Sequence, residues 1–258
     1  MNMTGNTILI TGGGSGIGLA LALELKKLNN EVIIAGRSQG KLTEAAHLGF
    51  KTMTVDMTDA KSIEALAKKA IADFPSLNGV IHNAGIMKNE NMLKGPTPEI
   101  RHETVMTNLL GPMQLTEVLL PHLIKQKSAF IMTVTSGLAY APLAMTPTYS
   151  ATKAAIHSYT QSLRYQLKDT AVQVIELVPP YVQTSLMGQR QASDPNAMPL
   201  NEFISEVMQI LKTEPDVKEI LVKRVHMQRF ATDAGPEKYN DFFNQFNDRM
   251  LAARKVEW

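Results

Sequence analysis

The stretch Thr7-Ile8-Leu9-Ile10-Thr11-Gly12-Gly13-Gly14-Ser15-Gly16-Ile17-Gly18 decides the fold prediction for this 258-residue chain. A short apolar, β-branched run comes first, then a glycine-rich turn, and a helical pattern from Leu19 to Leu28 follows. The backbone N–H groups at the start of a helix attract anions, so this arrangement favours a nucleotide phosphate. The glycine spacing is T-G-x-x-x-G-x-G and differs from the usual dinucleotide pattern G-x-G-x-x-G.

Outward from that turn, strand-like and helix-like segments alternate along the chain. We expect strands at residues 7–11, 31–36, 51–55, 78–82, 129–135, 172–178 and 219–222. We expect helices at residues 19–28, 59–74, 98–127, 149–169, 200–211 and 236–253, the second capped by Thr58 or Asp59. This alternation predicts an α/β fold: a doubly wound, mainly seven-stranded parallel sheet flanked by helices, in one Rossmann-type domain over residues 1–258.

Composition excludes several classes of function. The chain has 26 Lys+Arg against 24 Asp+Glu, a net charge of +2 that gives no sign of a nucleic-acid or anionic-membrane partner. There are no cysteines, which excludes disulfides and thiol catalysis. The six histidines have no metal-ligand spacing, so we expect no catalytic metal. No apolar run reaches the length of a membrane span, and we expect a soluble cytoplasmic protein.

The end of the second expected strand bears on the choice of cofactor. A carboxylate there would hold the ribose hydroxyls of NAD(H), but the chain has Gly36-Arg37-Ser38. A guanidinium can pair with a 2′-phosphate in bidentate fashion. The sequence therefore favours NADP(H) over NAD(H), the alternative being an arginine that is simply solvated.

Tyr149-Ser-Ala-Thr-Lys153 carries candidate acid–base chemistry. In a helix the two side chains stand one turn apart on the same face. A nearby ammonium, together with the charge of a cofactor, would lower the phenol pKa toward neutrality. The alternative is an ordinary surface helix. Ser136 follows the fifth strand outside any G-x-S-x-G elbow, which argues against a serine hydrolase. Asn108, in a helix disturbed by Pro112, is either structural or part of a water relay.

The segment after the sixth strand has no clear period. Residues 181–199 resemble a loop with an apolar underside at Leu186, Met187 and Met198, and we expect a substrate lid over about 181–212. Plain disorder is the alternative for the loop. The segment 226–258, which ends in Trp258, suggests no function.

Taken together and in order, these motifs resemble the short-chain dehydrogenase/reductase family in its single-domain form. The resemblance runs from about residue 7 to 184 and rests on the glycine turn, Asn83-Ala84-Gly85, Asn108, Ser136 and Tyr149-x-x-x-Lys153. The stretches Thr135-Ser-Gly-Leu-Ala, Pro142-Leu-Ala, Ala151-Thr-Lys-Ala-Ala-Ile-His and Glu176-Leu-Val-Pro-Pro further resemble DltE-type oxidoreductases.

The resemblance implies roles for individual residues. Tyr149 would be the general acid or base, Lys153 would bind the nicotinamide ribose and lower the phenol pKa, Ser136 would bond the substrate oxygen, and Asn108 would hold a water. The residues implied in cofactor binding are Thr11, Gly12, Ser15, Gly16, Ile17 and Gly18 (pyrophosphate), Arg37 and Ser38 (2′-phosphate), Asp56 and Met57 (adenine), Asn83, Ala84 and Gly85 (adenosine side), and Tyr149, Lys153, Pro179, Val182 and Thr184 (nicotinamide side). The residues expected to form a largely apolar substrate pocket are Leu138, Tyr140, Leu143, Pro180, Tyr181, Leu186 and Met187.

The chain departs from the family pattern in two places. His82 replaces the first asparagine of Asn-Asn-Ala-Gly, and Pro180 replaces the glycine of Pro-Gly. A second proline restricts Pro179 and removes a backbone N–H where nicotinamide and substrate would meet, which bears on the pocket floor.

The resemblance implies an NADP(H)-dependent oxidoreductase that acts on a carbonyl or alcohol, with a small-molecule substrate and a homodimeric or homotetrameric assembly. Two alternatives use the same fold. One is a non-catalytic NADP(H)-binding redox sensor or interaction protein; the other is an epimerase or dehydratase, for which the residues after Thr184 leave little room.

Overall fold

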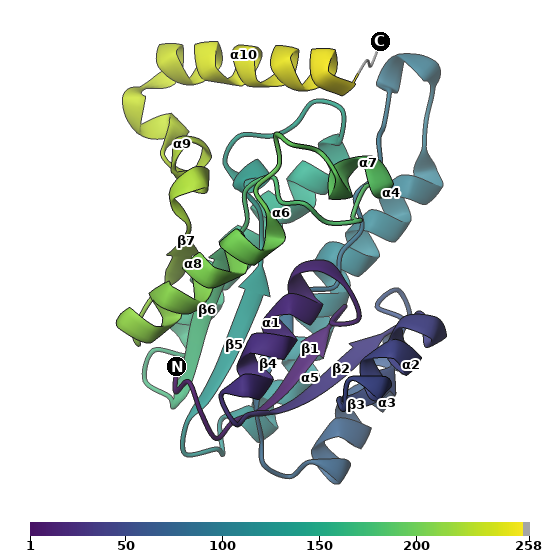
Figure 1. Cartoon of the computed structure of the whole chain (residues 1–258), viewed down its shortest axis with the longest axis vertical. Helices are drawn as coiled ribbons and strands as arrows, with labels where there is room; N and C mark the ends of the chain where they lie inside the picture. The colour runs from purple at the N-terminus through teal and green to yellow at the C-terminus, as the bar shows by residue number, and fades with distance from the viewer. Residues whose placement is uncertain (255–258) are drawn as a thin grey trace.

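A seven-stranded parallel sheet forms the centre of the computed structural model, which describes residues 1–254 (Figure 1). The spatial order of the strands is β3-β2-β1-β4-β5-β6-β7. Their bounds are β1 Thr7–Thr11, β2 Glu31–Gly36, β3 Lys51–Thr54, β4 Leu77–His82, β5 Ala129–Val134, β6 Val172–Val178 and β7 Glu219–Leu221. The strand order reverses between β1 and β4, the position at which parallel α/β sheets bind ligands beyond the carboxyl ends of the strands. The fold predicted from the sequence is therefore confirmed.

Helices cover both faces of the sheet. One face packs against α1 (Gly16–Lys27), α2 (Gln39–His47) and α8 (Leu200–Thr213), and the other against α3 (Ala60–Asp73), α5 (Gly111–Leu123) and α6 (Pro147–Gln166). Alternate residues of a strand point to opposite faces. In β1 this places Ile8 and Ile10 in the first core and Leu9 in the second. Because both faces are covered, all five residues of β1 are buried.

The long helix expected at residues 98–127 is divided into three parts. α4 (Pro98–Val105) continues into a π-helical segment, η2 (Met106–Leu110), before α5 begins at Gly111. A Cβ at Gly111 would lie 3.0 Å from the carbonyl oxygen of Met106 and closer still to that of Met57. Pro112 has no N–H to continue the ladder. The distortion places Asn108 inside the π-helical segment. As expected, Asp59 caps α3, since its side chain accepts a hydrogen bond from the backbone N–H of Lys61. Helix α2 was not predicted.

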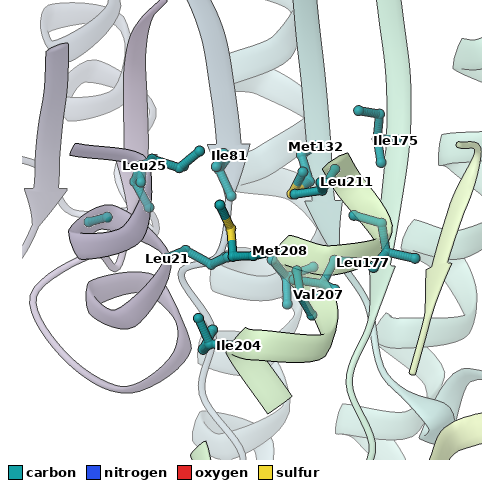
Figure 2. Packing of buried hydrophobic residues seen from close by; sticks show 14 of the residues in the cluster. Leu21, Leu25, Ile81, Met132, Ile175, Leu177, Ile204, Val207, Met208 and Leu211 are labelled. Atoms are coloured by element: carbon teal, nitrogen blue, oxygen red, sulfur yellow. The ribbon is translucent and has the colours of Figure 1, made fainter. Parts of the chain in front are cut away.

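The lid expected over about residues 181–212 includes a helix that belongs to the core. In this helix, α8, Val207 is fully buried, and Met208 and Leu211 are 5% and 2% exposed. Figure 2 shows Met208 beside Leu21 of α1, and Leu211 near Met132 of β5. The apolar face of α8 is thus buried against the sheet and α1. Only residues 181–199 remain as the proposed lid.

The C-terminal part forms its own layer beyond the ends of the strands. It contains η4 (Lys223–Val225), α9 (His226–Arg229), η5 (Ala231–Ala234) and α10 (Pro236–Arg254), and α10 crosses that end of the molecule (Figure 1). Trp258, singled out in the sequence, lies outside the described residues. Within residues 1–254, no helix combines the length and apolar character needed to cross a membrane.

Because α8 is a core element, truncating Leu211 should destabilise the whole fold. We expect Leu211→Ala to lower the free energy of unfolding by about 2–5 kcal/mol, the range for a buried leucine that leaves a cavity. Gln209→Ala, at an exposed position of the same helix, is the matched control and should have little effect. Urea unfolding measures both. An equally small effect for Leu211→Ala would mean that α8 is a mobile lid instead.

Candidate active site

A cleft of about 730 Å³ lies beyond the carboxyl ends of the central strands. Its lining comes from both halves of the sheet and from the loop after β6. The sequence-predicted residues that line it are Gly12, Ser15, Gly16, Ile17, Arg37, Ser38, Asp56, Met57, Asn83, Ala84, Gly85, Ser136, Tyr149, Lys153, Pro179, Pro180, Val182, Thr184, Leu186 and Met187. Segments far apart in the chain therefore meet in one place.

The glycine-rich turn is shaped by close backbone contacts. Gly12 has φ +66°, and a Cβ there would lie 2.7 Å from the Cα of Ala84. The Asn83 side chain joins the two segments, since its Nδ2 donates to the carbonyls of Thr11 (3.1 Å) and Gly12 (3.0 Å). A Cβ at Gly18 would collide with that amide. Because these positions carry no side chain, a ligand can lie directly against the backbone of the turn.

Two residues predicted to contact the pyrophosphate do not line the cleft. Thr11 is fully buried, and its hydroxyl accepts hydrogen bonds from the N–H groups of Asn83 and Ala84, each at 3.2 Å. Gly18 is packed against Asn83. Both residues stabilise the turn, and direct contact with a pyrophosphate stays a prediction for them.

Cations gather at the end of the cleft near β2. Arg37 Nη1 lies 3.4 Å from a carboxylate oxygen of Glu103, and Lys88 Nζ lies 2.6 Å from the other oxygen. Hydrogen bonds from Lys88, and the charges of Lys88 and Arg37, lower the pKa of the Glu103 carboxyl. Lys41 Nζ donates to the Ser15 hydroxyl at 3.0 Å. Three cations therefore lie at this end, and Glu103 pairs with two of them.

Asp56 and Met57 stand at the end of β3 next to that basic group. The Asp56 carboxylate accepts hydrogen bonds from the backbone N–H of Thr58 (2.9 Å) and from its hydroxyl (2.8 Å), and the backbone bond is the larger cause of the lowered Asp56 pKa. Met57 is 5% exposed and belongs mainly to the core. Asp56 is thus an ionised acceptor at the wall of the cleft.

Ser136, Tyr149 and Lys153 converge in the middle of the cleft. Ser136 follows β5 and begins a short turn, η3 (Gly137–Ala139). Tyr149 and Lys153 stand on one face of α6, with the Lys153 nitrogen 5.5 Å from the centre of the Tyr149 ring. Lys153 is 5% exposed and donates to the carbonyl of Val134 at 2.7 Å. The alternative of a surface Tyr–Lys pair is therefore wrong.

The protein groups by themselves shift the Tyr149 pKa in the direction opposite to the prediction. Burial raises the pKa of Tyr149 to about 12, and a hydrogen bond with the Ser136 hydroxyl acts against that rise. Burial also lowers the pKa of Lys153 to about 8, opposed by the negative charge of Glu176. Desolvation disfavours the charged form of either group. Burial thus outweighs the Ser136 hydrogen bond, and the lowering by Lys153 together with a cofactor's charge stays a prediction.

Asn108 is buried and anchors the loop after β4. Its Oδ1 accepts from the backbone N–H of Ile86 (2.9 Å), and its Nδ2 donates to the Ile86 carbonyl (2.9 Å) and to the Thr152 hydroxyl (3.3 Å). The side chain does not line the cleft. These bonds favour the structural interpretation left open by the sequence, and the water relay stays a prediction.

Four of the seven predicted substrate-pocket residues lie away from the cleft: Leu138, Tyr140, Leu143 and Tyr181. The chain coils into η3 after Ser136, so the Tyr140 hydroxyl points instead to Glu176 (3.2 Å) and His157 (3.0 Å). Leu143 is 1% exposed, and Tyr181 donates to Asp194 at 3.0 Å. The other three, Pro180, Leu186 and Met187, line the cleft.

The proposed lid is tied down at both ends of its loop. Val182 forms a bridge with Met198, and Gln191 Nε2 donates to the Val182 carbonyl (2.9 Å) and to the Thr184 hydroxyl (3.2 Å). From α10, Arg254 lies 3.1 Å from the Met187 sulfur. The loop has short helical structure at α7 (Gln189–Ala192), so the prediction of an irregular or disordered segment is wrong for that part.

Sequence reasoning missed part of the cleft wall. The residues not predicted are Gly14, Gly36, Lys41, Leu42, Val55, Ile86, Met87, Lys88, Asn89, Thr107, Val134, Thr135, Ser185 and Gln191. Half of them directly follow or precede a predicted residue. The sequence contained a signal for Lys41: it lies three residues after Ser38, the spacing of side chains that share one face of a helix.

The comparisons with known proteins agree with this geometry. Residues 6–195 match the family model described as short chain dehydrogenase. The chain is 42% identical to the oxidoreductase DltE of Bacillus subtilis (strain 168) over 254 residues, covering 96% of this chain and 98% of that protein.

Solved structures share the fold at lower identity. A short chain dehydrogenase from Burkholderia cenocepacia J2315 in complex with NADP superposes with a TM-score of 0.79 at 22% identity, covering 94% of this chain and 99% of that one. A short chain dehydrogenase/reductase from Burkholderia phymatum in complex with NAD has a TM-score of 0.78 at 18% identity, covering 90% and 95%. With a family match over most of its length, this chain belongs to the short-chain dehydrogenase family of oxidoreductases.

Proposed function

We propose that this protein transfers a hydride between NADP(H) and a carbonyl or alcohol substrate. The observation that carries the proposal is the convergence of Ser136, Tyr149 and Lys153 in the same cleft as the glycine turn. The hydroxyls of Ser136 and Tyr149 and the ammonium of Lys153 then lie in the same cleft as the backbone of the glycine turn, which can hold a dinucleotide. Asn108 would secure this arrangement through its hydrogen bonds to Ile86 and Thr152.

The residues at the glycine turn fit a pyrophosphate. Helix α1 begins at Gly16 with no side chain capping it and no acidic residue in its first turn. The first N–H groups of a helix require acceptors, and the helix dipole favours a negative one. Gly12 leaves no room for a side chain between the turn and Ala84. This end of the cleft thus offers donors and bare backbone, as a phosphate group requires.

The chain's own residues would bind the cofactor and move the proton. Gly12 to Ile17 would hold the pyrophosphate, and Lys153 with Thr184 would orient the nicotinamide side. The nicotinamide supplies the hydride when it is bound. Tyr149 would donate its phenolic proton to the substrate oxygen during reduction and take it back during oxidation, while Ser136 donates a hydrogen bond to the same oxygen.

A phenol with a pKa of about 12 donates a proton only when the phenolate formed is stabilised. The Lys153 ammonium and the Ser136 hydroxyl are the protein groups placed to do this. Both act at short range in a site where water is largely excluded, which strengthens their effect. We therefore expect a positively charged Lys153 to be a condition for turnover.

Basic residues near β2 support NADP(H) over NAD(H). Arg37, Ser38 and Lys41 all line that end of the cleft. Glu103 already pairs with Arg37 and Lys88, so it would compete with a phosphate for the same cations. The net charge of this end still favours an anion, since three cations face two carboxylates, those of Glu103 and Asp56. The related structures in complex with NADP and with NAD are compatible with either cofactor.

The substrate side of the cleft is apolar. Pro180, Leu186 and Met187 line the same cleft as Ser136 and Tyr149. Such a surface favours a carbonyl compound with a hydrophobic substituent over a highly charged one. The unusual Pro180 is part of this wall, and the carbonyl of Pro179 accepts the N–H of Gly137 at 2.9 Å.

Removing the Tyr149 hydroxyl should abolish the proton transfer. We expect Tyr149→Phe to lower kcat for reduction by at least about 100-fold, the lower end of the range for general acid catalysis. NADPH binding, followed by its fluorescence, should be retained. Tyr165→Phe, on the same helix but 71% exposed, is the matched control. Absorbance of the reduced nicotinamide, with a panel of ketones and aldehydes, measures turnover.

Full turnover by Tyr149→Phe would contradict the proposal. Tight NADPH binding by the unmutated protein, without turnover on a broad panel, would favour the non-catalytic sensor instead.

Reversing the charge at residue 37 should alter cofactor choice. We expect Arg37→Asp to raise the KM for NADPH about tenfold to a hundredfold, because a charge-assisted hydrogen bond to the 2′-phosphate is lost. The KM for NADH should change much less. Arg101→Asp, at an exposed position of α4, tests for a nonspecific effect of charge. Equal KM values for both cofactors in the unmutated protein would contradict the role of Arg37.

We also propose a homodimer or homotetramer built on the helices that carry Asn108 and Tyr149. Large apolar side chains are exposed there: Leu110 (44%), Ile124 (43%) and Tyr165 (71%). Sedimentation equilibrium should give a mass of two or four times 28.4 kDa. A single 28.4 kDa species at micromolar concentration would overturn this assembly.

A further inference from the structure

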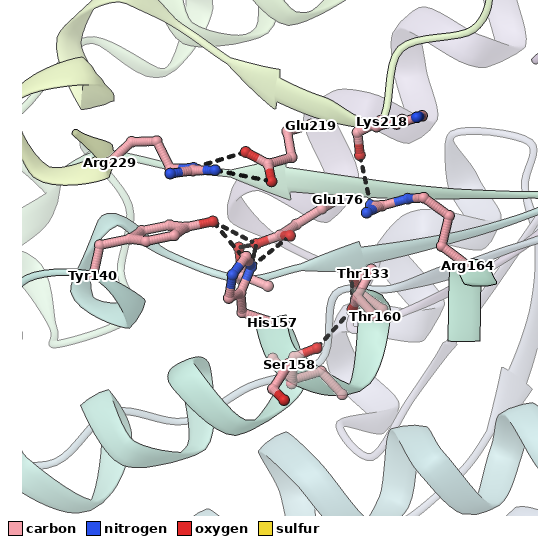
Figure 3. A network of polar contacts seen from close by, with 12 residues as sticks. Thr133, Tyr140, His157, Ser158, Thr160, Arg164, Glu176, Lys218, Glu219 and Arg229 are labelled. Carbon is pink, nitrogen blue, oxygen red and sulfur yellow. Dashed lines mark hydrogen bonds and ion pairs between the residues drawn. The ribbon is translucent and has the colours of Figure 1, made fainter. Parts of the chain in front are cut away.

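A carboxylate with no exposure lies in the middle of β6. Glu176 is 0% exposed, between Ile175 and Leu177, which are also fully buried. Its partners are the hydroxyl of Thr135 (2.7 Å), the hydroxyl of Tyr140 (3.2 Å) and Nδ1 of His157 (2.8 and 3.0 Å to its two oxygens). Figure 3 shows Tyr140 and His157 pointing toward this carboxylate. Since His157 Nδ1 faces an acceptor, it is the donor in that contact.

The partners of Glu176 adjoin the residues of the proposed active site. Thr135 directly precedes Ser136, and Tyr140 ends the turn that Ser136 begins. His157 stands one helical turn beyond Lys153 on the same face of α6. One carboxylate therefore joins β6, the turn that carries Ser136 and the helix that carries Tyr149 and Lys153.

Stability alone gives no reason for this carboxylate. Burying a charge costs free energy even when it is hydrogen-bonded, and apolar replacements of buried ionic groups are often neutral or stabilising. The neighbouring β6 residues Val174, Ile175, Leu177 and Val178 are all buried and apolar. An apolar residue at 176 would continue this pattern, so the carboxylate calls for a functional reason.

The C-terminal layer adds contacts to the hydrogen-bond network around Glu176. Arg229 of α9 contacts both oxygens of Glu219 (2.7 and 3.2 Å) and lies 4.7 Å from the centre of the Tyr140 ring. Tyr239 of α10 donates to the Tyr140 carbonyl at 3.3 Å. Although His157, Glu176 and Glu219 each offer a ligand atom within 4.8 Å of the others, Arg229 already pairs with Glu219, and His157 with Glu176. The ligand atoms of this cluster are therefore already engaged in contacts within the protein.

The charge of Glu176 also reaches Lys153. The groups that face Glu176 are Tyr140, His157, Lys153, Glu219 and Arg229, and among them Lys153 is the cation buried in the cleft. Burial lowers the pKa of the Lys153 ammonium to about 8, and the Glu176 carboxylate is the protein charge that raises it again. Without that carboxylate, Lys153 would lose its proton at a lower pH.

We propose that Glu176 is a positioning residue of the active site, whose buried carboxylate holds the Ser136 turn against α6 and balances the charge of Lys153. This inference rests on the proposed function only for its kinetic consequence. The charge effect of Glu176 on Lys153 can be tested without turnover. Thr135, Tyr140 and His157 transmit the positioning effect, and none of them exchanges a proton with the substrate.

The first measurement is the titration of Lys153 by NMR, in protein carrying 13C at the lysine Cε, with the signal assigned by its loss in Lys153→Met. The midpoint in Glu176→Gln should fall below that of the unmutated protein, whose Lys153 pKa is about 8. Glu219→Gln removes a carboxylate of the same network that is already paired with Arg229, and it should leave the midpoint in place. An unchanged midpoint in Glu176→Gln would overturn the electrostatic part of the inference.

The second measurement is the pH profile of kcat for carbonyl reduction. A cationic Lys153 is lost as pH rises through its pKa, so the fall of activity on the alkaline side should begin at lower pH in Glu176→Gln. A purely structural role would lower kcat equally at every pH. Thr135→Val should reduce kcat about tenfold through the misplaced Ser136, with the KM for NADPH unchanged. Unchanged kcat in Thr135→Val would overturn the positioning part.

The two measurements separate the two ideas. If the unmutated protein reduces no carbonyl but the Lys153 midpoint falls in Glu176→Gln, the proposed function fails and the coupling stands. If turnover is normal and neither the midpoint nor the profile moves, the coupling fails and the function stands. Should Glu176→Gln not fold, Glu176→Asp retains the charge with a shorter reach. It should preserve the Lys153 midpoint while lowering kcat, and the opposite pattern would overturn the inference.

Discussion

The buried ammonium of Lys153 is the constraint on which this site depends. A charge that is 5% exposed must be compensated within the protein, since the water it has lost would have stabilised it. The Val134 carbonyl at the end of β5 accepts its hydrogen bond, and the Glu176 carboxylate on β6 supplies an opposite charge. Helix α6 is thereby held across the ends of two neighbouring strands. Tyr149 and Ser136 come together because α6 and β5 are fixed in that position.

The other half of the cleft is built from backbone contacts. Asn83 joins the end of β4 to the turn after β1, where Gly12 allows the chain to pass against Ala84. The strand order reverses at this point, so the helices that follow β1 and β4 leave on opposite faces and open a crevice. Bare backbone donors occupy one side of that crevice, and titratable side chains occupy the other. The division suits a ligand that has a phosphate group and a reactive ring.

The C-terminal layer is joined to the loops around the cleft. Asn247 of α10 accepts the N–H of Ala144 (2.6 Å) and donates to the Pro142 carbonyl (3.2 Å), which fixes the loop between η3 and α6. Arg190 of α7 donates to the carbonyls of Ala253 and Arg254, so α10 and the proposed lid are joined. Because one helix anchors both the loop after η3 and the proposed lid, the C-terminal segment has a structural part in the site. The sequence had suggested no function for it.

Local patterns in the sequence were sufficient for the strands, for most helices and for the residues at the strand ends. Strand periodicity, the glycine turn and the spacing of Tyr149 and Lys153 are properties of neighbouring residues, and parallel sheets collect strand ends at one edge. Only the tertiary structure decided the rest: that α8 fills the core, that Tyr140 turns from the cleft to Glu176, and that burial raises the Tyr149 pKa. These outcomes depend on pairs such as Thr135 with Glu176 and Ala144 with Asn247, 41 and 103 residues apart. The direction and solvation of a side chain are set by such distant partners, and a local pattern contains no information about them.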